Sequence, residues 1–172
     1  MTATQTKTLI SGLITLVLAA ALWPRIPALA HYATTARVHL HGPDVSLWSA
    51  QPLAIKFHIF AAALAFLIGL LILVRPKGRG LHKTFGWAWV IAMGATAISS
   101  FFIRGLNGNA FSLIHLLSGW VVVALPMALY AIRNKRVNLH RRLMTGLFVG
   151  GLVIAGGLTF IPGRLMYQLF FG

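Results

Sequence analysis

Long apolar runs separated by short polar connections dominate the chain. A bilayer-crossing helix needs about 20 mostly apolar residues, because each residue rises about 1.5 Å through a hydrocarbon core about 30 Å thick. Five runs reach or approach that length: Thr8 to Trp23, Ala54 to Val74, Phe85 to Ile103, Ala110 to Ile132 and Leu143 to Leu165. The pattern therefore predicts an all-α integral membrane protein with five transmembrane helices.

The runs divide the chain into unequal parts. Residues 1–23 are predicted to form an N-terminal transmembrane helix, 24–53 an outer loop, 54–166 a four-helix membrane domain and 167–172 a C-terminal tail. The first run is short and precedes Ala28-Leu29-Ala30, as in a cleaved secretory signal. Because its leading segment holds only Lys7 as a basic residue, we expect an uncleaved signal anchor instead.

The membrane domain contains an internal repeat. The segment from Arg75 to Lys83 recurs 58 positions later from Arg133 to Arg141, and the two copies share R-x-K-x-x-x-L-H-[K/R]. Upstream, His58 and His115 lie 57 positions apart. Within each copy the two histidines are 24 or 25 residues apart, about one membrane crossing plus a turn. Each copy is thus predicted to be a helical hairpin with a histidine near either bilayer face.

Two such hairpins in tandem predict a pseudo-two-fold four-helix bundle with its axis along the membrane normal. The axis would place His58 opposite His115 at the outer level and His82 opposite His140 at the inner level. Diagonal helices of a bundle lie about 12 to 14 Å apart, wide enough for a flat macrocycle between two imidazoles. Glycines in the last run, including the Gly146–Gly150 step, are interpreted as sites of close helix packing.

Composition and charge exclude several classes of protein. Apolar residues make up 58% of the chain and charged residues 9%, which excludes a soluble domain. The net charge of +14 arises from 15 Lys and Arg against one acid, Asp44. Since the charges lie at helix ends, they indicate attraction to anionic membrane lipids and not nucleic acid binding. The absence of cysteine excludes disulfides, iron–sulfur clusters and thioether-linked haem.

The charges also predict orientation. The second and fourth connections are rich in Lys and Arg and should be cytoplasmic, which places the N-terminus inside and the C-terminus outside a bacterial inner membrane. These basic residues are Arg75, Lys77, Arg79 and Lys83 in the second connection and Arg133, Lys135, Arg136, Arg141 and Arg142 in the fourth.

Paired histidines in a low-polarity slot are typical of b-type haem, whose iron takes an imidazole nitrogen on each axial side. The candidate iron ligands are His58 with His115 and His82 with His140. None of the five runs contains Asp or Glu, so a carboxylate proton relay of the transporter type is not expected. Three cations near the histidines, Lys56, Lys83 and Arg141, could meet haem propionates, although side chains extending to the interface explain them more simply.

The four histidines, with L-H-R-R-L-M around His140, resemble the transmembrane di-haem cytochromes b of the ferric and ascorbate reductase type. They resemble more closely a bacterial family of predicted membrane proteins of unknown function. That family shares an H-[KR]-x-x-G step, here His82 to Gly86, and an H-R-R-x-M step, here His140 to Met144. The resemblance covers about Ala54 to Met166. The cytochromes imply that the two histidine pairs are axial, whereas the closer family implies no activity.

Together these observations favour a membrane-embedded protein that holds two b-type haems and transfers electrons across or within the bilayer, as a transmembrane oxidoreductase would. A quinone is a further candidate cofactor, and the donor could be a quinol or a soluble reductant. Ferric iron, superoxide or another protein could accept the electrons. The alternative is a haem-free membrane subunit, or a quinone- or lipid-binding protein with structural histidines. The sequence leaves open a homodimer or a larger membrane complex.

The outer loop adds three histidines and the acid. His39 and His41 form an H-x-H step near Asp44, with His31 upstream. Imidazole and carboxylate groups of this kind can bind a divalent metal, but the spacing is common and no second carboxylate is available. A solvated loop is the favoured interpretation.

Overall fold

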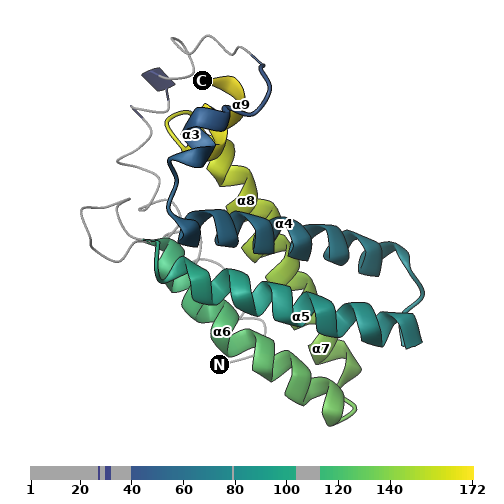
Figure 1. Ribbon diagram of the computed structural model, residues 1–172. Helices are drawn as coiled ribbons and strands as arrows, with labels where there is room; N and C mark the ends of the chain where they lie inside the picture. Colours follow the sequence, from purple (N-terminus) through teal and green to yellow (C-terminus); the bar gives the residue numbers. More distant parts are fainter. Residues whose placement is uncertain (1–26, 28–29, 32–39, 79, 104–112) are drawn as a thin grey trace.

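Figure 1 shows the computed structural model of the protein, which describes residues 27, 30–31, 40–78, 80–103 and 113–172. Every regular element in this part of the chain is helical. The α-helices are α3 (Val45–Ser49), α4 (Leu53–Val74), α5 (Gly80–Ser100), α6 (Leu113–Arg133), α7 (Val137–Phe148), α8 (Ala155–Gly157) and α9 (Leu165–Phe171). A π-helical turn (Val149–Ile154) joins α7 to α8, and a 3₁₀ turn (Leu158–Phe160) follows α8.

Three of the described helices are long and apolar enough to cross a membrane: Leu53–Val74, His115–Arg133 and Val137–Phe160. The first expected run lies outside the described residues. Helix α5 matches α4 and α6 in length but is less apolar, because it contains His82, Lys83 and several hydroxyl residues. The structure thus confirms a helical membrane protein, while the total of five spans stays a prediction.

The long helices pack in chain order. Helix α4 packs along α5, α5 along α6, and α6 along α7, while the π-helical turn contacts both α4 and α6 and so closes the ring. The two hairpin connections, α4 to α5 and α6 to α7, lie at the same end of the bundle, which we call the basic end (Figure 1). This order agrees with two tandem hairpins, and the pseudo-two-fold axis between them stays a prediction.

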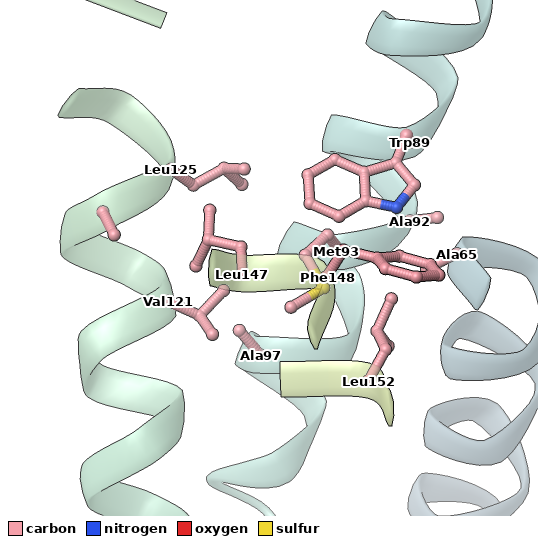
Figure 2. Packing of buried hydrophobic residues seen from close by; sticks show 11 residues of the cluster. Ala65, Trp89, Ala92, Met93, Ala97, Val121, Leu125, Leu147, Phe148 and Leu152 are labelled. Atoms are coloured by element: carbon pink, nitrogen blue, oxygen red, sulfur yellow. The ribbon is translucent and has the colours of Figure 1, made fainter. Parts of the chain in front are cut away.

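Helix α5 contributes most to the core. Its Trp89, Ala92, Met93 and Ala97 point toward Leu147, Phe148 and Leu152 of the last span, as Figure 2 shows. Met93 and Leu147 are the largest fully buried side chains, each 1% exposed. Buried alanines on the flanking helices, Ala61 and Ala65 on α4 and Ala124, Ala128 and Ala131 on α6, leave room for this close approach.

Gly69 and Gly151 allow side chains of neighbouring helices to approach more closely than a residue with a Cβ atom would permit. A Cβ atom on Gly69 would overlap the Phe148 ring and lie 3.0 Å from Trp89 Nε1, and one on Gly151 would lie 2.6 Å from Met93 Cε. Gly146 and Gly150 have nothing within 4 Å of such a Cβ atom. The expected close packing at the Gly146–Gly150 step is therefore absent within the described chain, because that step lies away from the neighbouring helices.

The last span ends earlier than the apolar run does. It stops at Phe160, because Pro162 cannot continue a helix and Gly163 adopts a left-handed conformation with φ of 84°. The chain then folds back into α9. Backbone carbonyls of Leu169 and Phe170 accept hydrogen bonds from Asp44 N (3.1 Å) and His41 N (3.0 Å), which docks the segment before α3 on α9 (Figure 1).

The close contact at Gly69 predicts a site-specific loss of stability. Gly69→Ala should lower the free energy of unfolding by about 1 to 3 kcal/mol, because the added methyl group must displace the Phe148 ring. Gly146→Ala, with open space around the new Cβ atom, is the control and should be neutral or slightly stabilising. Thermal unfolding in detergent measures both; an equal effect of the two substitutions would contradict this packing.

Candidate functional site

His58 is held by the neighbouring helix of its own hairpin. It lies on α4, is partly buried, and its Nδ1 is 3.0 Å from the Ser99 hydroxyl of α5. The Ser99 hydroxyl in turn donates to the carbonyl of Thr96, one turn earlier (3.0 Å). The ring is therefore fixed by a hydroxyl on α5 and not by a residue of α6.

A second hydroxyl contact joins α5 to α6. The Ser100 hydroxyl donates to the carbonyl of Ala97 at 2.7 Å, and its oxygen lies 2.5 Å from the Ser118 hydroxyl of α6, from which it can accept. His115 lies one turn before Ser118, is 8% exposed, and its ring is 6.2 Å from that of Phe101. We call the four buried hydroxyl residues Thr96, Ser99, Ser100 and Ser118 the hydroxyl layer. This layer links α5 to α4 on one side and to α6 on the other, next to both outer histidines.

The other two histidines lie at the basic end. His82 lies in the first turn of α5 and His140 in the first turn of α7. His140 Nδ1 lies 2.9 Å from the backbone carbonyl of Ala128 on α6, so that nitrogen carries the proton and donates it. This hydrogen bond leaves Nε2 as the other nitrogen of the His140 ring.

The structure thus places the two predicted pairs differently. His82 and His140 both lie in the first turns of their helices, α5 and α7, at the basic end. His58 Nδ1 lies 3.0 Å from the Ser99 hydroxyl, and the His115 ring lies 6.2 Å from the Phe101 ring. The pairing of these outer rings through a shared ligand stays a prediction.

The three predicted propionate partners have different surroundings. Lys56 Nζ donates to the Ser49 carbonyl at 2.8 Å, which ties the start of α4 to α3. Lys83 and Arg141 are exposed on the first turns of α5 and α7, next in sequence to His82 and His140. Only these last two are therefore placed near the histidine pair at the basic end.

The outer-loop residues that the structure describes have structural partners. His41 uses Nδ1 toward the Gly42 carbonyl (2.6 Å) and Nε2 toward the Gly172 carbonyl (3.0 Å). Asp44 caps α3 by accepting from Leu47 N (2.9 Å) and from the Ser46 hydroxyl (2.6 Å). His39 lies outside the described residues. Within the described ranges no group of three or more His, Asp or Glu side chains is placed to hold a metal ion.

A family comparison covers the part of the chain that contains the four histidines. Residues 55–170 match the model of a family described as predicted membrane protein, DUF2306. The chain belongs to the DUF2306 family. The matched region contains His58, His82, His115 and His140, whereas the start of the chain and the outer-loop histidines lie before it. No curated protein and no solved structure matches the chain.

The hydroxyl layer was not among the residues predicted from sequence. Its signal is present in the DUF2306 region, since Thr96, Ser99 and Ser100 recur at helical spacing and Ser118 follows His115 by one turn. Polar residues that recur along one face of an apolar helix indicate a polar contact between helices. The sequence does not reveal which helix supplies the partner.

Loss of the α5–α6 hydroxyl contact should have a measurable cost. Ser118→Ala should lower the free energy of unfolding by about 0.6 to 1.7 kcal/mol, the range of interhelical hydrogen bonds in membranes. Ser49→Ala is a control, because that exposed hydroxyl bonds only within its own helix, to Ser46. Equal unfolding curves for Ser118→Ala and the parent chain would argue against the layer as a tie between helices.

Acid should weaken the α3 cap. Hydrogen bonds from the Ser46 hydroxyl and Leu47 N lower the pKa of Asp44 from its ordinary value. A lowered native pKa means that the cap contributes fully above the ordinary carboxyl pKa and is lost as pH falls through the native one. The protection of Val45–Ser49 against hydrogen exchange, relative to the intrinsic rate at each pH, should therefore fall below about pH 4. Ser46→Ala should shift that loss of protection to higher pH, and an unchanged midpoint would contradict the assignment.

Proposed function

We propose that this DUF2306 protein is a membrane-embedded electron carrier that binds b-type haem and moves electrons across or within the bilayer. The first haem site is His82 with His140 at the basic end. The observation that supports it is that both histidines lie in the first turn of a helix, α5 and α7, at the same end of the bundle (Figure 1), although 58 residues separate them in the sequence.

The chemistry of this pair fits an axial haem site. An iron-ligating histidine uses one ring nitrogen for the metal and donates the other N–H to a carbonyl or carboxylate, which fixes the tautomer and the ring orientation. His140 meets this condition through Ala128, which leaves Nε2 as the ligand atom. His82 would supply the opposite ligand. A bound haem would provide a one-electron centre, and the role of these side chains is to fix its position and potential.

The basic end also offers charge for the propionates. Lys83 and Arg141 directly follow the two histidines and are exposed. Because the only acid of the chain, Asp44, lies before α3, no side-chain carboxylate competes for these cations. They are suited to hold two propionate groups at the membrane surface.

The second haem of the proposal would use His58 and His115. His58 has the same arrangement as His140, since a partner on a neighbouring helix holds its Nδ1. With centres at both ends, electrons could cross the bilayer; with the basic-end site alone, they would enter and leave at one face.

The hydroxyl layer supports a second candidate function. Imidazole and hydroxyl groups can bind the oxygen atoms of a quinone or lipid head group, and the layer places four hydroxyls next to His58 and His115. In that case the protein would be a haem-free quinone- or lipid-binding subunit. The same purified protein distinguishes the two candidates.

An absorption spectrum tests the proposal. The detergent-purified protein, expressed with haem supplied, should show a Soret band and a sharp α band after reduction with dithionite. His140→Ala should remove the signal of one centre, because it eliminates one axial ligand. His41→Ala is the matched control, since that imidazole bonds only backbone carbonyls, and it should leave the spectrum unchanged.

Two outcomes would contradict the haem proposal. One is a folded, colourless protein under these conditions, which would favour the quinone- or lipid-binding alternative. The other is a coloured protein whose spectrum is the same in His82→Ala, His140→Ala and the parent chain, which would place the pigment elsewhere.

A further inference from the structure

The connection between α6 and α7 forms a shallow, largely open hollow lined by cations. Its volume is about 540 Å³, and the residues around it are Lys135, Arg136, Val137, Asn138, Leu139 and Arg142. The three basic side chains are exposed. Val137 and Leu139, 58% and 40% exposed, give the same hollow an apolar edge.

These three cations cannot be neutralised by an acidic side chain of the chain itself. The sequence contains one acid, Asp44, and its carboxylate caps α3 at the other end of the bundle from this connection (Figure 1). Three like charges around one hollow repel each other, so an external anion in it would be favourable.

Lys135 occupies a position that a glycine would fill at lower cost. Helix α6 ends in a pair of bonds, Arg136 N to the Ala131 carbonyl (2.8 Å) and Lys135 N to the Ile132 carbonyl (3.1 Å). This closing pattern requires a left-handed residue, usually glycine, and here that residue is Lys135 with φ of 59°. In the connection of the first hairpin, a glycine, Gly78, has the positive φ of 82°. The second connection thus has a cationic side chain at a position where the left-handed backbone favours glycine.

We propose that this hollow binds the phosphate of an anionic membrane lipid. Guanidinium and ammonium groups of Lys135, Arg136 and Arg142 would hold the phosphate, and Asn138 would add a hydrogen-bond donor. The hollow lies between the ends of two candidate spans, His115–Arg133 and Val137–Phe160, which is the level of lipid head groups. Val137 and Leu139 would contact the start of an acyl chain, which a soluble phosphate compound lacks.

Lys135 should have two effects, strain in the backbone and a positive charge for the phosphate. A single substitution distinguishes them. Lys135→Gly should raise the thermal unfolding temperature by about 2 to 4 °C, because it relieves the left-handed strain. The same substitution should weaken binding of phosphatidylglycerol, because it removes one of the three cations. A purely structural turn predicts the first change without the second.

The test titrates phosphatidylglycerol or phosphatidylcholine into the full chain in neutral detergent and follows lipid adducts by native mass spectrometry. Arg142→Gln should weaken phosphatidylglycerol binding about tenfold or more, the loss expected for a charge-assisted hydrogen bond. Lys77→Gln is the matched control. It also removes one charge from the basic end, but its Nζ bonds the Leu73 carbonyl at 2.6 Å and lies outside the hollow. Its effect should stay below about threefold.

Each outcome decides the proposal. Selective loss in Arg142→Gln, together with weak phosphatidylcholine binding, supports a lipid phosphate site. Equal loss in Arg142→Gln and Lys77→Gln would overturn it in favour of diffuse attraction between the basic end and anionic lipid. Displacement of phosphatidylglycerol by millimolar inorganic phosphate would also overturn it, since the ligand would then be a soluble phosphate. An unchanged unfolding temperature in Lys135→Gly would remove the argument from strain.

Discussion

A partly buried imidazole needs an acceptor for its ring N–H, and in a bundle of apolar helices a neighbouring helix can supply it. His58 and His140 meet this requirement in different ways. His58 uses the hydroxyl of Ser99 on α5, and His140 uses the backbone carbonyl of Ala128 on α6. In both cases the bond crosses from one helix to the next within a hairpin, so the same interaction that satisfies the histidine also fixes the hairpin. Any ligand that binds to the remaining ring nitrogen would meet an imidazole whose orientation is already set.

Charge imposes a second constraint on the molecule. With a single acid, the chain cannot form networks of internal ion pairs, and its cations must face water, lipid head groups or a bound anion. In the part of the chain that the structure describes, the buried polar side chains are four hydroxyl residues and the imidazole of His115. Electron transfer through cofactors held by neutral imidazoles is compatible with such an interior, whereas proton transfer through carboxylates is not.

Much of the fold was predictable from the apolar runs, and the exceptions have physical causes. The helices α4 and α6 begin and end close to the expected residues, because hydrophobic length determines where a helix can leave the bilayer. The last span ends at Phe160 instead of Leu165 because Pro162 and Gly163 break it, a signal present in the sequence but outweighed by the apolar residues that follow. Helix α5 contains so many polar residues that its composition does not predict its position at the centre of the hydrophobic core.

The site was predictable only in part. The repeat predicted that His82 and His140 lie at the same end of the bundle, because equivalent positions of two hairpins return to the same end. Both residues lie in the first turns of α5 and α7 at the basic end (Figure 1), and their pairing stays a prediction. It could not indicate Ser99, Ser118 or the carbonyl of Ala128 as partners, because helical periodicity defines a face and not the neighbour against which that face packs. The left-handed conformation of Lys135 could not be predicted for a similar reason. The repeat aligns Lys135 with Lys77, and identical residues give no sign that their backbone conformations differ.

The central claim is that His82 and His140 share one ligand. Electron paramagnetic resonance of the oxidised, detergent-purified protein tests it most directly. The account predicts a low-spin ferric signal of the kind that two axial imidazoles produce, and conversion of that centre to a high-spin signal in His140→Ala, where one ligand is missing. A protein without any ferric haem signal, or a low-spin signal unaltered by removal of either imidazole, would contradict it.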